Sequence, residues 1–408
     1  MFKLLHTADW HLGQRFLHRD RLEEQTRTLD WLLDQVKVWA PDAFVLAGDV
    51  FDVSNPSNAA MTLYYRFLTS LRKTDCRHII VVGGNHDSPS RLNAPYALLK
   101  SMDVHVIGHA EQGLNKQIIP LHHESGKLEA VVAAVPFLRD QDLRYTNLEA
   151  TETDRLASIR NGIKAHYQQL AESIQEQYGN LEVPCITTGH LYVKGGSRAG
   201  DKIDRIHMGS IDSIDAETFP NVFDYVALGH LHRPQMVDHQ LPHIRYSGSL
   251  IPLSFSEITD QKSVALIHFE ANTSPTIQLE PVPVARRLIR ISGEFETVQQ
   301  KLQDLTIEDD QLPAWVECIV ETDQIIPDLD GQLRSLTKDR PFEILKLRST
   351  ETIQGLDELI SQKELEELSV WDVFEERLKL VDGTPEQLDT YRQSFGALLD
   401  WIEQEDNL

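Results

Sequence analysis

The first half of the chain alternates short apolar runs with longer segments in which apolar residues recur every three or four positions. The short runs, each of strand length, fall at residues 3–7, 43–47, 78–82 and 104–107. Helical periodicity marks residues 22–39, 58–72 and 91–100, with Asn58 as the expected N-cap of the second helix. This alternation predicts an α/β fold built on a largely parallel sheet.

After residue 117 the apolar runs become shorter and more closely spaced. Strands are expected at 117–121, 129–134, 185–188, 225–228, 243–246, 263–269 and 276–280. A polar helix over 152–177 interrupts this series. Pro281-Val282-Pro283 then breaks the pattern and indicates a domain boundary.

The remaining segment is typical of a small α+β unit followed by helices. Strands at 286–291, 315–321 and 342–347 are expected to alternate with helices at 297–305 and 329–336. Two amphipathic helices should follow, one over 369–380 and one starting at Thr384 with the stripe Leu388, Tyr391, Phe395, Leu398 and Ile402. They suit docking on a partner helix, with packing on their own domain as the alternative. We therefore expect three domains, at residues 1–282, 283–350 and 351–408.

The charge of the chain limits the ways in which it can bind a partner. The net charge is −24, and residues 351–408, with 16 acidic and 4 basic side chains, carry half of it. An acidic total argues against binding nucleic acid by bulk attraction. It leaves room for a local basic face, or for a site where metal cations supply the positive charge.

Cysteine usage and the N-terminus both favour a cytoplasmic protein. Cys76, Cys185 and Cys318 are scattered and form no CxxC pair, so we expect small core residues in a reducing compartment. The first residues reach His6 and Asp9 too soon to contain the apolar region of a signal peptide. The chain has no run of about 18 apolar residues, so no membrane span is expected.

Candidate chemistry lies where the apolar runs end. Five of them lead directly into Asp, Asn or His: Thr7-Ala8-Asp9-Trp10-His11, Gly48-Asp49-Val50-Phe51-Asp52, Gly84-Asn85-His86-Asp87, Gly189-His190 and Gly229-His230-Leu231-His232. Ligands of open α/β sheets bind at the carboxyl ends of strands, so these side chains should converge on one rim. Imidazole, carboxylate and amide donors without thiolates favour a borderline-hard dication over a structural zinc centre.

The number of candidate ligands indicates two ions. Seven side chains qualify: Asp9, His11, Asp49, Asn85, His190, His230 and His232. A single ion cannot use all of them, whereas two ions that share Asp49 can, with room left for water and a phosphate oxygen. Two ions about 3.5–4 Å apart clamp the attacking and leaving oxygens of a displacement at phosphorus. The pattern therefore predicts hydrolysis of a phosphate ester.

Other residues near these motifs are given supporting roles. His86 follows the Asn ligand and should project beside the metals, where it stabilises phosphoryl charge or protonates the leaving 3′-oxygen. Asp52 and Asp87 are candidates for orienting a histidine, or else simple turn formers. His6 is expected to be a packed core histidine. The candidates for contacts to substrate phosphates near the metals, with solvated surface residues as the alternative, are Arg15, Arg19, Arg21 and Arg91.

Several stretches together resemble a known family. LLHTADWHLGQ, VLAGDVFD, VVGGNHDSP, TTGHLY, VALGHLHRPQ and YSGSLIPLSFSE are similar to the calcineurin-like metallophosphoesterase superfamily, and within it to the SbcD family. The resemblance covers the whole chain and is strongest up to about Phe269. It implies an α/β metallophosphoesterase β-sandwich flanked by helices, then a small α+β capping domain that binds DNA, then a C-terminal helical segment.

The resemblance also implies a site and an activity. It implies two manganese ions, one held by Asp9, His11, Asp49 and His232, the other by Asp49, Asn85, His190 and His230, with His86 as the catalytic histidine. The implied activities are ATP-dependent 3′→5′ exonuclease on double strands and endonuclease on single strands and hairpins, in DNA repair, recombination and replication. Alternatives are another binuclear-metal phosphatase or phosphodiesterase, and a non-catalytic scaffold.

The implied assembly is a nuclease homodimer within a heterotetramer. The partner is an SbcC-type ABC ATPase with coiled coils, and the C-terminal helices would dock on it. Family analogy puts the homodimer interface on the helices that carry Tyr64, Tyr65, Phe67 and Tyr96, which the sequence alone would assign to the core.

Overall fold

A computed structural model describes most of the chain. The described residues are 1–110, 114–143, 152–180, 182–194, 214–271, 273–307, 312–322 and 326–351, with Leu378, Tyr391, Arg392 and Phe395. The chain divides into two units, Met1–Val320 with Asp328–Arg348, and Glu321–Pro327 with Ser349–Leu408. The predicted C-terminal helices fall in the second unit and, those four residues apart, lie outside the described residues. None of the described helices combines the length and apolar character that a bilayer crossing requires.

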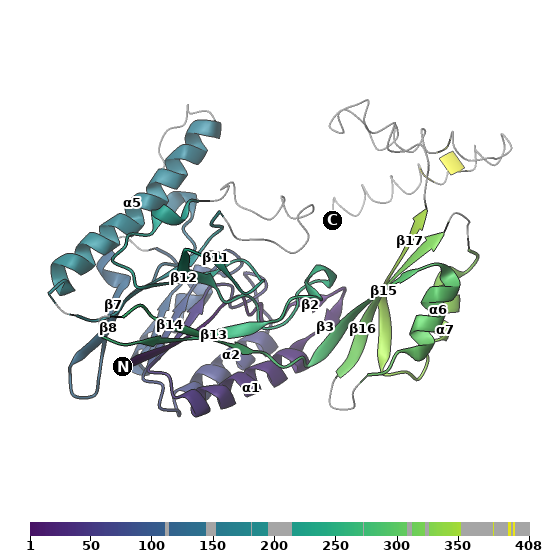
Figure 1. The fold of residues 1–408 in the computed structure, drawn as a ribbon, viewed down its shortest axis with the longest axis horizontal. Helices are drawn as coiled ribbons and strands as arrows, with labels where there is room; N and C mark the ends of the chain where they lie inside the picture. Colours follow the sequence, from purple (N-terminus) through teal and green to yellow (C-terminus); the bar gives the residue numbers. More distant parts are fainter. Residues whose placement is uncertain are drawn as a thin grey trace. The chain divides into compact units, whose positions relative to one another are not determined.

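Two six-stranded sheets pack face to face in the first unit (Figure 1). The first has the order β14-β13-β1-β4-β5-β6, with β1 (Phe2–Thr7), β4 (Ala43–Ala47), β5 (His78–Val82), β6 (Val104–Ile107), β13 (Ser263–Phe269) and β14 (Thr276–Pro281). The second has the order β11-β12-β10-β9-β8-β7, with β7 (Ile118–His122), β8 (Leu128–Ala133), β9 (Cys185–His190), β10 (Tyr225–Gly229), β11 (Gln235–Asp238) and β12 (Leu241–Tyr246). The expected α/β sandwich is confirmed.

Both sheets contain parallel strands in the middle and antiparallel strands at one or both edges. In the first sheet β1, β4, β5 and β6 are parallel, whereas β13 and β14 are antiparallel to their neighbours. In the second sheet β8, β9, β10 and β12 are parallel, and the edge strands β7 and β11 are antiparallel. The single largely parallel sheet expected from the sequence is thus a pair of mixed sheets. The four-residue edge strand β11 was not predicted.

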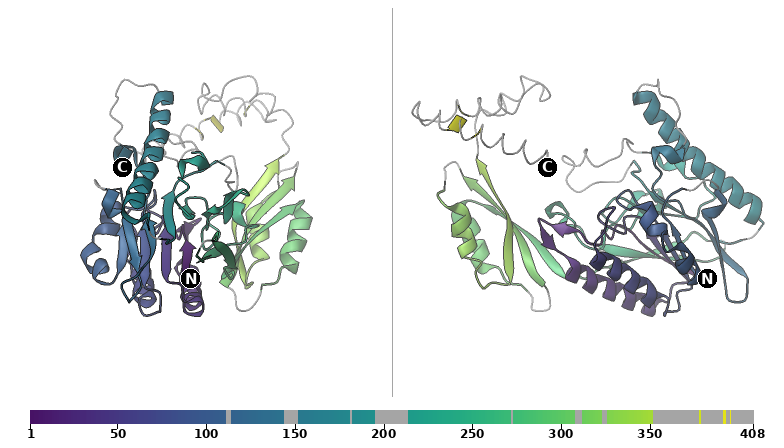
Figure 2. Two further views of the ribbon diagram at one scale, coloured as in Figure 1. Left: turned by 60° about the vertical axis from the view of Figure 1, so that its left-hand side comes forward. Right: turned by 180° about the vertical axis from the view of Figure 1, so that it is seen from behind.

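Helices cover the outer faces of both sheets (Figures 1 and 2). The first sheet packs against α1 (Leu22–Trp39) and α2 (Asn58–Leu71), and the second packs against α5 (Glu152–Tyr178). Because central strands are then buried on both faces, they read as continuous apolar runs. The shorter elements are β2 (Arg15–Phe16), β3 (Arg19–Asp20), α3 (Pro89–Asn93), α4 (Tyr96–Ser101), η1 (Leu114–Lys116), η2 (Asp140–Leu143), η4 (Ala216–Thr218) and η5 (Phe255–Glu257).

Two helix predictions need correction. The N-cap of α2 is Ser57 and not Asn58, because the Ser57 side chain accepts a hydrogen bond from the backbone N–H of Ala60. The helix expected over 91–100 is two short helices, α3 and α4, that meet at Pro95. Proline has no N–H to continue the hydrogen-bond ladder, so it interrupts the helix there.

The aromatic residues proposed for a dimer interface fall into two groups. Tyr64 and Phe67 are 1% and 3% exposed and belong to the core between α2 and the first sheet, so they are not surface residues. Tyr65 packs partly against the same core. Tyr96 remains 44% exposed on α4, next to Leu98 at 64%.

A small three-stranded sheet follows Pro283 in the predicted β-α-β-α-β order. It contains β15 (Arg286–Gly293), β16 (Leu312–Thr322) and β17 (Phe342–Glu351), with α6 (Phe295–Asp304) and α7 (Leu329–Ser335). Trp315 on β16 stacks on Phe16 at 5.4 Å between ring centroids, and the Arg286 guanidinium lies 4.2 Å above the Trp315 ring. The stacking of Phe16 on Trp315 joins the small sheet to the sandwich, whereas the cation–π contact links β15 to β16 within the small sheet.

Candidate metal centre

The loops after β1 and β4 run side by side past the edge of the first sheet. The backbone N–H of Asp9 donates to Gly48 O, and that of His11 donates to Asp49 O, each at 3.0 Å. Asp9, His11 and Asp49 all adopt left-handed backbone, with φ of 52°, 44° and 48°. Such conformations cost about 1–3 kcal/mol each in non-glycine residues and cluster at functional sites. Here they turn three side chains toward one point.

Two glycines allow the ligand loops to approach one another. A Cβ on Gly84 would lie 2.1 Å from Asp49 Oδ1, and a Cβ on Gly48 would lie 2.1 Å from His190 Nδ1. Neither distance is possible, so any side chain at these positions would push the ligand loops apart. This explains physically why glycine precedes the polar residues at these strand ends.

The predicted ligands come together from both sheets. Asp49 Oδ2 lies 3.1 Å from His190 Nε2 and 3.5 Å from His11 Nε2. Asn85 Oδ1 lies 3.0 Å from His190 Nε2 and 3.1 Å from His230 Nδ1. The His232 ring lies 5.1 Å from the His11 ring. All seven predicted ligand residues therefore surround one centre.

Asp49 lies between two groups of donor atoms. Within the described ranges, two sets of side chains have donors within 4.8 Å of one another: His11, Asp49 and His86, and Asp9, Asp49 and His190. Asp9 Oδ2 and His11 Nε2 are buried and have no hydrogen-bond partner among the described residues. Buried polar atoms are seldom left unpaired, and a divalent cation would satisfy both. The donor set fits a pair of divalent ions.

Acidic and basic groups in this centre shift each other's pKa values. Burial lowers the pKa of His11, but its hydrogen bond with Asp52 and the nearby charge of Asp49 outweigh burial and raise it to about 9. Burial of His190 is likewise outweighed, mainly by Asp49, and its pKa is raised to about 9. Burial disfavours the charged Asp49 carboxylate, yet the same histidines hold its pKa well below the usual range. Without metal, imidazolium supplies the positive charge that the carboxylates require.

Metal binding should therefore become tighter as the pH rises. In the metal-free protein His11 and His190 have pKa values of about 9, against an ordinary 6.5, so at pH 7 a metal ion must displace both protons. We expect the association constant for Mn²⁺ to rise about tenfold per pH unit for each proton released, and to level off above pH 9. Calorimetric titrations in buffers of different ionisation enthalpy would measure the protons released.

Stability of the metal-free protein should change in the opposite direction. A histidine with a raised pKa contributes stability that is fully present below pH 6.5 and is lost as the pH rises through about 9. The midpoint temperature of thermal unfolding, measured in EDTA, should fall as the pH rises through this window. Saturating Mn²⁺ should remove this fall. A flat affinity profile without proton release would contradict both expectations.

Comparisons with known proteins agree with this chemistry. A family profile described as calcineurin-like phosphoesterase matches residues 2–234, and one described as type 5 capsule protein repressor C-terminal domain matches residues 284–382. The chain is 34% identical over 392 residues to the SbcD component of nuclease SbcCD from Escherichia coli K12, covering 96% of this chain and 95% of that protein. This chain belongs to the SbcD family. The corresponding SbcD proteins of Rhodobacter capsulatus and Bacillus subtilis are each 35% identical, over 75% and 68% of this chain and 76% and 68% of their own lengths.

Membership of the SbcD family makes the chain a metal-dependent nuclease subunit and its centre that of a hydrolase. His86 lies beside the ligands, as the sequence predicted. Its Nδ1 donates to the backbone O of Asp52 at 2.7 Å, and its ring lies 4.9 Å from that of His11. Because Nδ1 carries the proton for this bond, Nε2 is the nitrogen left for chemistry.

The two aspartates given supporting roles differ. Asp52 Oδ1 lies 3.2 Å from His11 Nδ1, the contact needed to orient that imidazole. Asp87 accepts the backbone N–H groups of Val50, Phe51 and Gly84, so its carboxylate organises the loops and does not orient a histidine. Burial, followed by the charge of Asp49, raises the pKa of Asp87 to about 6.

Glu257 is a residue that the sequence reasoning missed. It lies on η5, and its Oε1 is 3.4 Å from His232 Nδ1. Lys262 Nζ donates to Glu257 Oε2 at 2.6 Å and to the backbone O of His232 at 2.8 Å. Burial opposes the charged form, but the bonds with His232 and Lys262 lower the pKa of Glu257 to about 2. It stays ionised and holds the His232 ring in one orientation.

Substitution of Asp52 tests whether a histidine-orienting contact controls metal affinity. Asp52→Asn retains the size of the side chain and removes the charge that favours the His11 orientation. We expect metal affinity to fall about 10–100-fold. Without metal, the unfolding temperature should fall slightly at neutral pH, because the hydrogen bond with Asp52 helps to raise the pKa of His11. With saturating metal it should change little, since the Asp52 side chain is 26% exposed. Competition with a fluorescent chelator would give the affinity, and unchanged affinity would exclude the orienting role.

The four candidate DNA-contact arginines are not equivalent. Arg21 is 1% exposed and bonds to Glu24, Gln14 and the backbone O of Pro252, so it is a structural residue. Arg19 is exposed and pairs with Glu343 on the small sheet. Arg15 and Arg91 are also exposed and stay candidates.

Proposed function

We propose that this chain cuts DNA at a pair of manganese ions, with Asp49 shared between the two. One ion would be held by Asp9, His11, Asp49 and His232, and the other by Asp49, Asn85, His190 and His230. When bound, the ions supply a hydroxide nucleophile and stabilise the charge on the phosphoryl oxygens. The observation that carries the proposal is the position of Asp49, whose carboxylate belongs to both donor groups.

The surrounding side chains complete the proposed reaction. Asp52 and Glu257 hold the rings of His11 and His232, so that the donor nitrogens stay oriented toward the ions. His86, anchored through Nδ1, presents Nε2 to the phosphoryl group or to the leaving 3′-oxygen.

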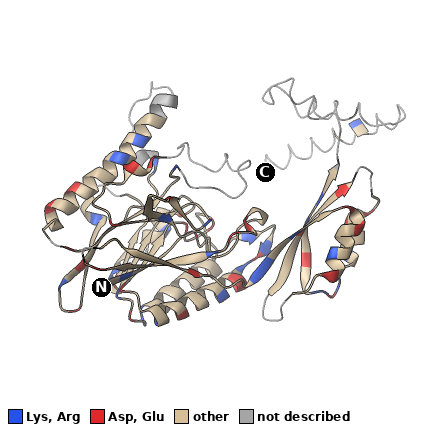
Figure 3. Cartoon of the chain, in the orientation of Figure 1, with Lys and Arg blue, Asp and Glu red and all other residues tan. Residues whose placement is uncertain are grey.

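DNA binding must overcome the acidic total of the chain. Figure 3 shows basic residues interspersed with acidic ones, and a local run on β15 contains Arg286, Arg287 and Arg290. Arg286 is held by Trp315 and Glu24, so the exposed Arg287 and Arg290, with Arg15, Arg19 and Arg91, would contact the phosphate backbone. We therefore assign residues 283–350 as a capping domain that binds DNA, between a nuclease domain at 1–282 and partner-docking helices at 351–408. The substrates would be double-strand ends, hairpins and single strands.

The assembly we propose is a heterotetramer in the cytoplasm. Two copies of this chain would pair and bind two copies of an SbcC-type ABC ATPase, because the relatives are named as subunits of SbcCD. Of the aromatic positions considered for the homodimer contact, Tyr96 is exposed, and Leu98 beside it on α4 is exposed as well.

A substrate comparison tests the activity. The full chain, with and without its ATPase partner, is assayed with Mn²⁺ on a hairpin oligonucleotide and on nitrophenyl phosphate. Cleavage of the hairpin, stimulated by the partner and ATP, is the expected result. Rapid hydrolysis of nitrophenyl phosphate with intact DNA in every arm would favour a phosphatase instead. Elemental analysis and the same assay with Mg²⁺ or Zn²⁺ would test the preference for manganese.

A further inference from the structure

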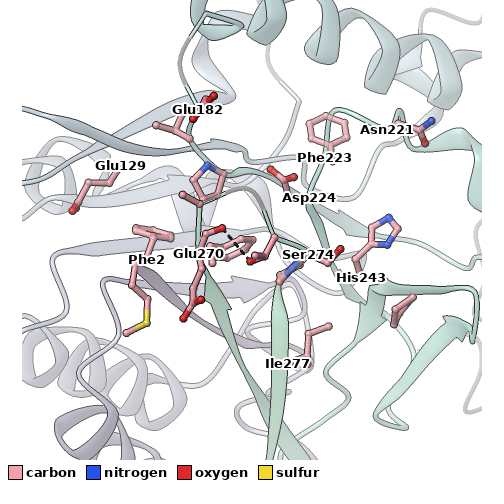
Figure 4. Close-up of a pocket in the computed structure, with 18 of the residues that line it drawn as sticks. Phe2, Glu129, Glu182, Asn221, Phe223, Asp224, His243, Glu270, Ser274 and Ile277 are labelled. Atoms are coloured by element: carbon pink, nitrogen blue, oxygen red, sulfur yellow. Dashed lines mark hydrogen bonds between the residues drawn. The ribbon is translucent and has the colours of Figure 1, made fainter.

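A cavity of about 1160 Å³ lies at the end of the sandwich away from the metal centre (Figure 4). Its lining comes from the residues that begin β1 and β8, those that precede β9 and β10, and the hairpin between β13 and β14. The metal ligands instead follow the carboxyl ends of β1, β9 and β10. Strands of five or six residues, at roughly 3.3 Å per residue, put the mouth of the cavity on the order of 15 Å from the metal centre. Arg245 lies deeper, because it pairs with Ala227, three residues before His230, on the order of 10 Å from that centre.

Arg245 on β12 lines this cavity. The neighbours Ile244 and Tyr246 pack in the cluster under α5, so the alternate residue Arg245 points into the space between the sheets. Its side chain is only 6% exposed, and its Nε is buried without a hydrogen-bond partner. Across the described part of the chain, the Arg245 guanidinium makes no side-chain hydrogen bond or ion pair. Buried charges are normally paired, and this guanidinium has no partner in the described ranges, so a counter-charge is missing here.

The described polar groups of the cavity lining and those beside Arg245 form no ion pair with it. Glu129 in the cavity lining pairs with Arg77, and Asp224 Oδ2 accepts the backbone N–H of Cys185 at 2.8 Å. His6 Nδ1 lies 2.9 Å from the hydroxyl of Tyr225, and both side chains are buried. Burial, followed by the charge of Arg245, lowers the pKa of His6 to about 3, so it stays neutral. Burial keeps the Tyr225 phenol protonated, since it raises the pKa above its usual range.

The walls and mouth of the cavity restrict what could pair with Arg245. Phe2, Phe223 and Ile277 give the cavity apolar walls (Figure 4). Glu182 and Glu270, both exposed, also line it, and would repel a polyanion such as a nucleic acid strand. Pockets of this kind hold a ligand by apolar contact and fix it with a few polar groups.

We propose that this cavity binds a small organic anion, with its carboxylate or phosphate on Arg245 and its apolar body against Phe2 and Phe223. The ligand has one charged head, because Arg245 is the one buried cation that the lining offers among the described residues. The site is separate from the phosphodiester centre, and the proposal does not rest on the proposed function.

Paired probes test the head group. Benzoate and phenylphosphonate, each matched in shape to neutral benzamide, are titrated calorimetrically into the full chain. We expect saturable 1:1 binding of at least one anion. Benzamide should bind at least about tenfold more weakly than that anion, because a charged hydrogen bond is lost. The two anions distinguish a carboxylate ligand from a phosphate ligand. Equal binding of benzamide, or no saturable binding of either anion, would overturn the proposal.

Variants test the residue. Arg245→Met keeps the aliphatic stem of the side chain and should lower the affinity for the anion about 10–100-fold. Arg66→Met removes an exposed cation that pairs with Asp30 and should leave binding unchanged. Ser274→Trp adds bulk at an exposed position of the lining, and should block binding without changing DNA cleavage. If Arg245→Met does not fold, the Ser274→Trp variant alone tests whether the cavity binds the anion. Wild-type affinity in both cavity variants would refute the site.

Discussion

Replacing Asp49 by asparagine is expected to remove at least one of the two metal ions and to lower DNA cleavage by about 10³-fold or more. Asp49 Oδ2 lies between His190 Nε2 at 3.1 Å and His11 Nε2 at 3.5 Å. Asparagine keeps the size of the side chain and an acceptor for the backbone N–H of His86, which donates to Asp49 Oδ1. What it removes is the negative charge shared by both donor groups. Elemental analysis after dialysis gives the metal content, and a hairpin assay gives the rate.

A matched control makes this result interpretable. Asp30→Asn is the same chemical change at an exposed carboxylate that pairs with Arg66 on the surface, and it should leave both measurements unchanged. If the Asp49 variant retained two equivalents of metal and cleaved within about tenfold of the wild-type rate, the shared-ligand arrangement would be wrong.

His86→Asn should separate catalysis from metal binding. Asparagine retains an N–H that can reach the backbone O of Asp52, but it removes the second ring nitrogen. Loss of a positioned acid or base lowers rates by about 10²–10⁴-fold. Metal content should be unchanged, because the predicted ligand set does not include His86.

An exposed histidine supplies the control for that variant. His123 lies in the hairpin between β7 and β8, far along the chain from every ligand motif, and His123→Asn should cleave at the wild-type rate. Loss of metal from the His86 variant would place His86 among the ligands. Since its nitrogen lies within 4.8 Å of donors from His11 and Asp49, this outcome is a real test.

The residues of the candidate metal centre could be predicted because each one lies at the end of a strand that the apolar pattern revealed, or a few positions after it. Asp9, Asp49 and Asn85 needed only local sequence and the rule that parallel strands end at one rim. Glu257 obeys no such rule. It reaches His232 from 25 positions further along the chain, through a loop whose course depends on the packing of Lys262.

Whether a side chain is buried or exposed is harder to predict from the sequence when the residue type occurs in both places. Arg21 follows the first ligand motif, as expected of a phosphate-binding arginine, yet Glu24 and Gln14 bury it as a structural ion pair. Tyr64 lies on the inward face of α2, as the sequence alone indicated, and it was the family analogy that placed it at a dimer interface. The burial of Arg21 depends on tertiary contacts that a single sequence does not contain.

The donors of the metal centre come from opposite halves of the sandwich: Asp9, Asp49 and Asn85 from the first sheet, and His190, His230 and His232 from the second. During synthesis, an emerging chain cannot assemble this catalyst until residue 232 has left the ribosome and both halves have docked. The candidate metal centre therefore forms only when the whole native topology is in place, and a partly synthesised chain lacks some of its donors.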